Sequence, residues 1–529
     1  MNWITNPILR GFNPDPSIVR VGDDYYIATS TFEWFPGVQI HHSRDLMNWE
    51  LIAHPLNRPS QLDMKGNPAS GGVWAPCLSH DRGVFYLVYT DVKTSKTLAK
   101  DTHNFLVTAA DIRGDWSEPV YLNSCGFDPS LFHDDDGRHW LLSMVTDHRK
   151  GRNPFGGIIL QEYSVHGQCL TGPEYRIFQG TELGCTEGPH LYKRGAFYYL
   201  ITAEGGTGLG HAVTLARSRE ITGPYEVDPA NPILTSRNDP TLALQKAGHA
   251  DLVQTQNGQW YMVHLCSRPI PSRGRYPLGR ETAIQKVEWT EDHWLRLESG
   301  GNRPLVKVPA PGFPVCPAPA VPARDDFDGP RLSLHFQTLR IPLVEDSLSL
   351  TERPGFLRLK GRESLSSKHH QALVARRQQS FTYTAATCVE FEPENYKQMA
   401  GLVCLYDHEN FYYLRISYDD QLESKCLGIW SCDNNVFSYP LDRDVLIKDW
   451  QRCYLRVRVD YDRLQFYYAQ NDREWRAIGP ALDAGRLSDD YCREGKFTGA
   501  FVGLCCQDLT GRRKHADFDF FEYVEEGRE

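Results

Sequence analysis

The stretch DPSLFHDDDGRHWLLS, residues 128–143, is one of five copies of a single pattern in the first 265 residues. Each copy has a lead residue, an apolar pair at about the fourth and fifth positions, a Gly-containing turn and an aromatic strand. The copies start 54 to 62 residues apart, and their lead residues are Asp15, Trp74, Asp128, Glu187 and His249. Strands joined by such a turn form hairpins, and this period fits one propeller blade of about four strands. The sequence therefore predicts a five-bladed β-propeller.

Radial repetition brings equivalent positions of the blades to equivalent places around the ring axis. The five lead residues are therefore expected to meet one another. Three of them are carboxylates, one is Trp and one is His, whereas a repeat that serves only packing would place the same small or apolar residue in every blade. This set predicts a polar pocket on the axis.

A proline-rich segment divides the chain. Residues 306–323 (VKVPAPGFPVCPAPAVPA) hold six prolines in eighteen residues, which excludes a helix or a central strand and favours an extended spacer. Residues 1–305 carry the blades. Residues 324–529 alternate apolar and polar side chains between turn residues, as antiparallel strands of a sandwich do. The predicted fold is all-β, a propeller followed by a jelly-roll-like β-sandwich, with no long helix.

Composition limits the partners and the compartment. The net charge of −10 and the pI near 6.0 argue against nucleic acid, whose binding needs cationic side chains, and favour a neutral substrate. The N-terminus has no apolar stretch behind a basic one, and no run of eighteen apolar residues occurs, so export and membrane insertion are not expected. The fourteen scattered cysteines are typical of reduced thiols in a cytosolic protein.

Three acids that converge on one pocket suit hydrolysis of a glycosidic bond. One acid donates a proton to the leaving oxygen, and another activates water. A single Asp-Pro is more often a turn starter, but Asp15, Asp128 and Glu187 all lie close to a proline at matched positions of different blades. A third carboxylate raises the pKa of a Glu above its usual value of about 4.3 by charge repulsion, which keeps the donor protonated.

Four other residues each allow more than one interpretation. Phe32 and Trp74 are core aromatics or sugar-stacking platforms, and the lead position of Trp74 favours stacking. Arg280, in PLGRETAI, is a solvated cation, a clamp on sugar hydroxyls or the partner of a site carboxylate. His249 is a structural residue, or it faces water or a hard cation such as Ca²⁺, which would also need several oxygen ligands. The chemistry itself requires no cofactor.

The motifs NPDPS, GGVWAP, FDPSLF, TEGPH, HADLVQ and PLGRETAIQKVEW occur in this order and are followed by the sandwich pattern. This ordered set strongly resembles glycoside hydrolase family 43, the inverting β-xylosidases and α-L-arabinofuranosidases, over nearly the whole chain. The resemblance implies that Asp15 is the general base and Glu187 the general acid. It also implies that Asp128 tunes the pKa of the acid and orients it.

The same resemblance implies residues that hold the sugar and a metal ion. Phe32, Trp74 and Arg280 match positions that line the xylose subsite. His249 matches the axial histidine of the family, which is often associated with a bound calcium ion.

The two-domain form resembles exo-acting β-xylosidases that trim xylo-oligosaccharides inside the cell, usually as homo-oligomers, here a dimer or tetramer. In those enzymes a phenylalanine of the C-terminal domain closes the sugar pocket. Phe497 and Phe501, four residues apart in the expected strand KFTGAFVG, are the two candidates. Closing one end of the pocket would restrict the enzyme to chain ends.

Two departures from the family pattern bear on the leaving group. Thr146 stands where a tryptophan is expected beside the aglycone subsite, and the loop from Arg268 to Leu278 is shorter than in some relatives. The balance between xylosidase and arabinofuranosidase activity stays open, because both sugars present a similar pattern of hydroxyls.

Two other functions compete with this interpretation. A retaining fructan or sucrose hydrolase shares five blades and three acids, but it typically has a WMNDPN opening and an RDP motif. Here the opening is FNPDPS, and NDP occurs at residues 238–240, outside the lead positions. A sugar-binding propeller without catalysis would not need a spaced pair of acids.

Overall fold

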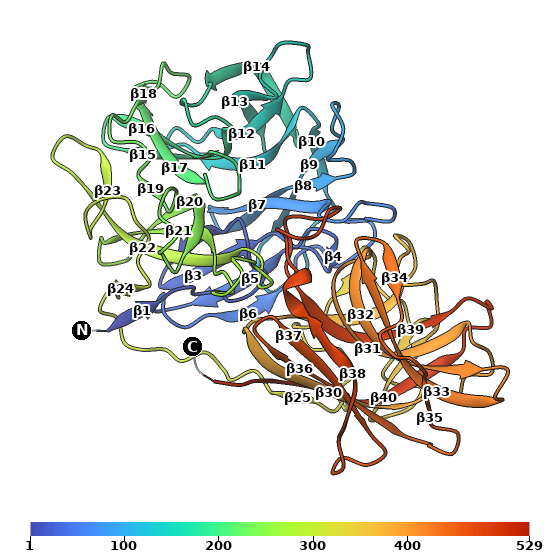
Figure 1. Ribbon diagram of the computed structural model, residues 1–529. Coiled ribbons are helices and arrows are strands. Elements are labelled where there is room, and N and C mark those ends of the chain that lie inside the picture. Colours follow the sequence, from blue (N-terminus) through green and yellow to red (C-terminus); the bar gives the residue numbers. More distant parts are fainter. Residues whose placement is uncertain (1, 528–529) are drawn as a thin grey trace.

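The structure is a computed structural model that describes residues 2–527. The first residue of the predicted propeller domain, residue 1, and the last two of the predicted sandwich domain, residues 528–529, lie outside the described residues. The regular structure of the described chain consists of strands and one 3-10 turn, η1 (Ala484–Arg486). No helix within residues 2–527 has the length and apolar character that crossing a membrane requires. Figure 1 shows two bodies of strands side by side, the second formed by the orange and red part of the chain.

Five antiparallel sheets form the propeller and confirm its prediction. The inner strand of each sheet comes first in the chain, and blade 4 carries one additional strand on β17. Blade 1 contains β2 (Ser17–Val21), β3 (Asp24–Thr29), β5 (Gln39–Ser43) and β6 (Glu50–Ala53); blade 2 contains β7 (Gly72–Asp81), β8 (Val84–Val92), β9 (Thr102–Ala109) and β10 (Val120–Asn123); blade 3 contains β11 (Gly126–His133), β12 (His139–Thr146), β13 (Phe155–Ser164) and β14 (Cys169–Phe178); blade 4 contains β15 (Glu187–Arg194), β16 (Phe197–Glu204), β17 (Ala212–Ser218), β18 (Glu226–Val227) and β19 (Leu234–Thr235); blade 5 contains β20 (Gln245–Gln254), β21 (Trp260–Ser267), β22 (Glu281–Trp289) and β23 (Leu295–Leu297).

The apolar and aromatic positions of the repeat pack one blade against the next. In the β11–β12 hairpin, Leu131 lies opposite Leu141. Both pack with Tyr86 and Val88 of blade 2 in one buried cluster, and full burial of such a side chain contributes about 1.5–3 kcal/mol. Gly137 adopts a φ of 85° in the turn, a conformation that glycine reaches without strain. The repeat pattern thus encodes both the hairpin and the contact between blades.

The ring closes where blade 5 meets blade 1. The Asp251 carboxylate accepts hydrogen bonds from the Ser17 hydroxyl at 2.9 Å and from the Ile18 amide at 2.8 Å. The Asn6 side chain donates to the Ile284 carbonyl and accepts from the Ile284 amide, both at 2.8 Å. The N-terminal segment therefore fixes the last blade to the first, which holds the five inner strands at the axis.

The C-terminal domain is a sandwich of two antiparallel sheets, as predicted. Alternate side chains of both sheets form one large buried core. The first sheet contains β25 (Arg324–Asp325), β27 (Leu348–Ser349), β28 (Leu357–Lys360), β40 (His515–Glu525), β30 (Thr382–Glu390), β36 (Cys453–Asp460), β37 (Arg463–Ala469) and β38 (Arg476–Asp483), and the second contains β29 (Ala372–Arg377), β39 (Phe501–Asp508), β31 (Gln398–Asp407), β32 (Asn410–Asp419), β33 (Ser424–Asp433), β34 (Val436–Ser438) and β35 (Val445–Leu446).

The proline-rich segment is extended but not a free spacer over its whole length. Its first part forms β24 (Lys307–Pro309), which pairs with β1 (Trp3–Thr5) in a two-stranded sheet. A proline at the end of a short edge strand removes no ladder hydrogen bond from a larger sheet, which explains why the prolines are tolerated. Further along, the Cys316 amide donates to the Asp45 carboxylate at 2.8 Å.

The two domains form a continuous interface. β4 (Trp34–Phe35) of the propeller pairs with β26 (Thr338–Leu339) of the C-terminal part. Phe501 is fully buried, and its ring stacks on Trp34 with 3.6 Å between ring centroids. Lys246 of blade 5 forms a buried ion pair with Asp489 at 3.3 Å.

Backbone contact between the domains is close at Gly279. Its φ is 70°, and a Cβ at this position would lie 2.2 Å from the Thr498 carbonyl oxygen. The Ala500 amide donates to the Pro277 carbonyl at 2.8 Å. Any larger residue at 279 would push the sandwich segment away, so this glycine lets the C-terminal domain reach the propeller axis.

Candidate active site

The five inner strands begin in the same unusual backbone conformation. One residue near the start of each inner strand has a positive φ: Asp15 (53°), Ala75 (22°), Asp128 (55°), Gly188 (55°) and His249 (48°). Such values are uncommon outside glycine and gather at functional sites. These positions align the five repeats. They correct the expectation that the five lead residues are equivalent, since Trp74 and Glu187 each lie one residue before the aligned position. Successive side chains of a strand point to opposite sides, so this offset gives Glu187 an orientation different from that of the two Asp residues.

Asp15 is buried and its two oxygens have different partners. Oδ1 accepts a hydrogen bond from Arg280 Nη1 at 2.9 Å, and Oδ2 accepts one from the Ser30 hydroxyl at 2.7 Å. His249 Nδ1 lies 3.7 Å from Oδ1. The buried Arg280 guanidinium forms an ion pair with Asp15 and compensates its negative charge.

Asp128 and Glu187 lie next to each other. Asp128 Oδ2 accepts a hydrogen bond from the amide of Gly188, the residue that follows Glu187, at 3.1 Å. Burial, and then the negative charges of Glu187 and Asp15, raise the pKa of Asp128 well above its ordinary value. The hydrogen bond to Gly188 holds the backbone beside Glu187, in agreement with an orienting role for Asp128.

The pKa of Glu187 is raised to about 7, first by burial and then by the negative charge of Asp15, while Arg280 and Lys100 act in the opposite direction. The sequence predicts charge repulsion from Asp128, whereas the repulsion that raises the pKa of Glu187 comes from Asp15. Glu187 can therefore hold a proton near neutral pH.

Aromatic rings line the same pocket. The Phe497 ring lies 6.1 Å from Phe32 and 5.8 Å from Trp74, and Phe32 and Trp74 are themselves 6.1 Å apart. Trp74 Nε1 donates to the Ser70 carbonyl at 2.8 Å, which fixes the indole. Two propeller rings and one sandwich ring thus form a wall on which a sugar can stack.

The structure separates the two phenylalanine candidates. Phe497 is partly exposed beside Trp74, whereas Phe501 is fully buried against Trp34 and Phe12. The expectation of one strand through both residues is wrong, because β39 begins at Phe501 and the segment before it is irregular. A ring without exposed surface cannot contact a substrate, so Phe501 holds the domains together and Phe497 is the pocket residue.

Arg280 connects Asp15 of the propeller to the sandwich. Besides its bond to Asp15, its Nη2 donates to the Phe497 carbonyl at 3.1 Å and its Nη1 to the Thr207 hydroxyl at 3.1 Å. Its guanidinium carbon lies 5.2 Å from the centre of the Phe32 ring. Of the three interpretations of Arg280, the structure places it as the partner of a site carboxylate, and it excludes a solvated cation.

His249 is buried, and burial lowers its pKa to about 4. Its ring lies against Gly188, where a Cβ would come within 2.9 Å of the imidazole. The His249 ring therefore lies between Asp15 and the backbone of Gly188. The group of His, Cys, Asp and Glu side chains in residues 2–527 that lie close enough to share a metal ion does not include His249.

The two departures from the family pattern lie outside the acid cluster. Thr146, at the end of β12, pairs with Phe155, whose ring is 6.4 Å from Phe127. Phe127 in turn contacts Trp74 at 5.3 Å, so Thr146 borders the outer part of the aromatic wall. In the loop that ends at Leu278, the Ile270 amide donates to the Arg275 carbonyl at 2.7 Å, and the loop contacts the sandwich.

Four supporting residues carry no signal in the sequence. Ser30 fixes Asp15, Thr207 fixes Arg280, and Ser70 accepts the amide hydrogens of Lys496 and Phe497 at 3.1 Å. Lys100 lies 5.3 Å over the Phe127 ring and lowers the pKa of Glu187. Hydroxyls and a lysine in loops have no spacing that marks them, so only the fold reveals their roles.

The arrangement has the groups that acid–base cleavage of a bond in a sugar requires. It offers a carboxylate paired with a guanidinium, a carboxyl group whose pKa is raised to about 7 and a wall of three aromatic rings. These groups come from blades 1, 2 and 4 and from the sandwich, so the complete pocket depends on both domains.

Comparisons with known proteins agree over the whole chain. Residues 4–295 match the model of Glycosyl hydrolases family 43, and residues 324–524 match that of the Beta xylosidase C-terminal Concanavalin A-like domain. The chain is 54% identical to the Beta-xylosidase of Bacillus subtilis strain 168, with 99% of each chain covered. It is 52% identical to Xylosidase/arabinosidase 43B of Humicola insolens, with 99% and 98% covered. The crystal structure of a xylan beta-1,4-xylosidase from Bacillus halodurans C-125 superposes with a TM-score of 0.97 at 56% identity and covers 99% of this chain and 100% of that one.

Proposed function

This chain belongs to glycosyl hydrolase family 43, and on that basis we propose that it is an inverting β-1,4-xylosidase. It removes xylose from the non-reducing ends of xylo-oligosaccharides. One observation carries the proposal: Asp15 is paired with the cation of Arg280, whereas burial and the nearby charge of Asp15 raise the pKa of Glu187 to about 7. Full-length relatives with more than half of their residues identical are named xylosidases.

We propose one step for each acid. Glu187 donates its proton to the glycosidic oxygen as the bond to the leaving sugar breaks, and Asp15 accepts a proton from the water that attacks the anomeric carbon. Arg280 and Ser30 hold the Asp15 carboxylate in place through that step. The water approaches from the face opposite the leaving group, so the configuration inverts.

The competing functions lose their support. A non-catalytic propeller does not explain a carboxylate paired with Arg280 beside a carboxyl group whose pKa is raised to about 7, and the family membership is that of a glycoside hydrolase. A retaining fructan hydrolase is disfavoured because the matched family is family 43 and the full-length relatives are named xylosidases.

The pH dependence of hydrolysis should show the titration of Glu187. This residue works in its protonated form, and its pKa is raised to about 7. Because the protonated fraction falls as the pH rises through the pKa, kcat/KM for xylobiose should decline above about pH 7. The measurement is a pH profile on xylobiose. An aryl xyloside with an acidic phenol is the control, and it should decline less because that leaving group needs no proton. An unchanged rate on xylobiose well above this pH would argue against Glu187 as the acid.

Phe497 should contribute substrate binding from the sandwich. Its ring completes the wall with Phe32 and Trp74, and losing that apolar contact costs about 1.5–3 kcal/mol. Phe497→Ala should therefore lower kcat/KM for xylobiose at least about tenfold. Tyr439→Ala, at an exposed aromatic of the same domain, is the matched control and should leave the rate unchanged. Equal rates for the two variants would remove Phe497 from the pocket.

The substrate range is tested with matched aryl β-xyloside and α-L-arabinofuranoside. We expect the xyloside to be the better substrate, and we expect measurable arabinofuranoside cleavage, because one relative is named for both activities. A preference for the arabinofuranoside would replace xylosidase with arabinofuranosidase as the main activity.

A calcium ion beside His249 stays a prediction. The Asp15 carboxylate lies near this ring, but it already forms an ion pair with Arg280. Calcium takes about six to eight oxygen ligands. These residues fit calcium poorly, since water would have to supply most of the shell, and no step of the proposed reaction uses the ion. If calcium binds here, EDTA should lower the Tm and calcium should restore it.

We also propose that the protein works in the cytoplasm as a homo-oligomer. Fourteen free cysteines, most of them buried, suit a reducing compartment. Size-exclusion chromatography with light scattering tests the oligomeric state, and a monomer at micromolar concentration would refute it.

A further inference from the structure

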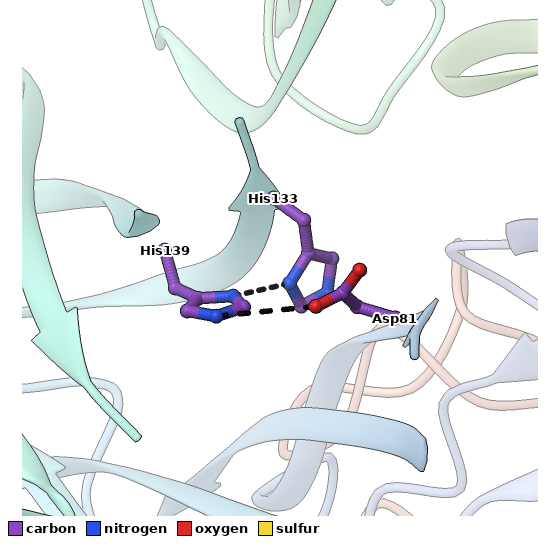
Figure 2. A group of neighbouring side chains, drawn as sticks. All are labelled: Asp81, His133 and His139. Atoms are coloured by element: carbon purple, nitrogen blue, oxygen red, sulfur yellow. Dashed lines mark hydrogen bonds and ion pairs between the residues drawn. The ribbon is translucent and has the colours of Figure 1, made fainter. Parts of the chain in front are cut away.

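A second group of reactive side chains lies where blades 2 and 3 meet, away from the catalytic acids. Figure 2 shows Asp81, His133 and His139 turned toward one another. Asp81 ends β7, His133 ends β11 and His139 begins β12. One ligand atom of each lies within 4.8 Å of those of the other two. We propose that these three side chains bind a divalent transition-metal ion of the zinc type, which joins the two blades.

The cluster is remote from catalysis. Asp128 and His133 lie five residues apart on β11, and a strand rises about 3.3 Å per residue, so roughly 16 Å separates them. The hairpin turns of the blades are at the opposite ends of the inner strands from the acids. An ion at this place cannot touch the substrate, and its effect is on the contact between the two hairpins.

The ligand set selects the kind of ion. Two imidazoles and one carboxylate, completed by a water molecule, form a common tetrahedral arrangement for zinc, whereas calcium and magnesium prefer oxygen ligands. The two Nδ1 atoms of His133 and His139 are 2.5 Å apart and are joined by a hydrogen bond. Zinc–nitrogen bonds of about 2.0–2.1 Å would place these atoms about 3.3 Å apart. A small separation of the two rings therefore lets the ion replace the proton.

A hydrogen bond orients the His133 ring within the cluster. The Ser79 hydroxyl lies 2.9 Å from His133 Nε2 and can accept the proton of that nitrogen, which leaves Nδ1 free to face the ion.

The ion can reach the cluster from solvent. A cavity of about 350 Å³ is lined by Asp81, His139 and Glu162 among other residues. Arg82 lies 3.6 Å from the Asp81 carboxylate and competes for it, but the Arg82 side chain is 73% exposed and can turn into solvent. The cavity and the mobile Arg82 side chain are consistent with a site that can bind and release an ion.

The test is a zinc titration of the full-length protein after EDTA treatment, followed by calorimetry. We expect one zinc ion per chain, and we expect His139→Ala to weaken binding at least about tenfold, as loss of one ligand does. His166→Ala is the matched control, since His166 is an exposed histidine in the loop after β13. Its affinity should equal that of the native protein.

A second measurement and a second variant distinguish the loss of zinc binding from misfolding of a variant. Zinc should raise the Tm of the native protein by at least about 2 °C, but not that of Asp81→Asn, which preserves the shape of the side chain. All variants should hydrolyse an aryl xyloside at the native rate, which shows that they are folded. Native-like zinc binding in both His139→Ala and Asp81→Asn, or no zinc binding by the native protein, would overturn the proposal. A calcium response that His139→Ala leaves unchanged would belong to a different site.

Discussion

Replacing Glu187 by glutamine should lower kcat/KM for xylobiose by about two to four orders of magnitude, which is what a general acid contributes. The glutamine amide has no proton to give, and the alkoxide of a leaving xylose cannot depart without one. Aryl xylosides with acidic phenols leave unaided and should lose far less. The measurement is a Brønsted series of aryl xylosides together with xylobiose, in which the rate of Glu187→Gln should depend steeply on the pKa of the leaving group.

Asp15→Asn provides the matched comparison. Asparagine keeps the size of the side chain. Its amide oxygen can still accept the bond from Arg280 and its amide nitrogen can donate to the Ser30 hydroxyl, but it cannot take a proton from water. Activation of water is needed for every leaving group, so this variant should be equally impaired on all substrates. If Glu187→Gln and Asp15→Asn showed the same pattern across the series, the separate roles of the two acids would be wrong.

The two variants should also differ in their pH profiles. Asp15→Asn removes the negative charge that raises the pKa of Glu187, so its residual activity on xylobiose should decline at lower pH than that of the native enzyme. Thermal melts are the stability controls for both variants, because each substitution changes the charge of a side chain in the acid cluster.

The propeller could be predicted because its signal is repeated. One Gly turn at Gly137 or one apolar pair at Leu131 is weak by itself, but five copies require a ring, and a ring brings the lead residues together. The exact alignment could not be predicted from the spacing. Trp74 and Glu187 lie one residue before the position that Asp128 occupies, and this offset is visible only in the positive φ values.

The contribution of the sandwich to the pocket was only partly predictable. The sequence narrows the pocket residue to Phe497 or Phe501, but both are aromatic and four residues apart, so periodicity cannot choose between them. Phe501 is ruled out as the pocket residue because it is fully buried and its ring stacks on Trp34. Long-range packing of this kind, like the bond from Arg280 to the Phe497 carbonyl, depends on segments more than 200 residues apart, which no local pattern encodes.

A chain that ends after Pro309 should be insoluble or should retain less than about 1% of the native activity on xylobiose. It keeps all five blades and the β1–β24 pair, but it loses the partner of β4 and the ring that covers Trp34. The exposed apolar area would include residues that belong to one core shared by both domains, such as Phe12, Phe32 and Trp34. Large newly exposed apolar patches promote aggregation.

The site would be damaged even if the shortened propeller stayed soluble. Arg280 would lose the Phe497 carbonyl that two of its nitrogens bind, and Glu33 would lose the buried Arg340 whose charge lowers its raised pKa. The aromatic wall would lack one of its three rings. Expression, gel filtration and xylobiose hydrolysis of the shortened chain decide the matter. A soluble monomeric propeller with the full-length rate would show that the sandwich is an independent module, whereas a soluble but inactive one would assign the loss to the pocket and its Arg280 anchor.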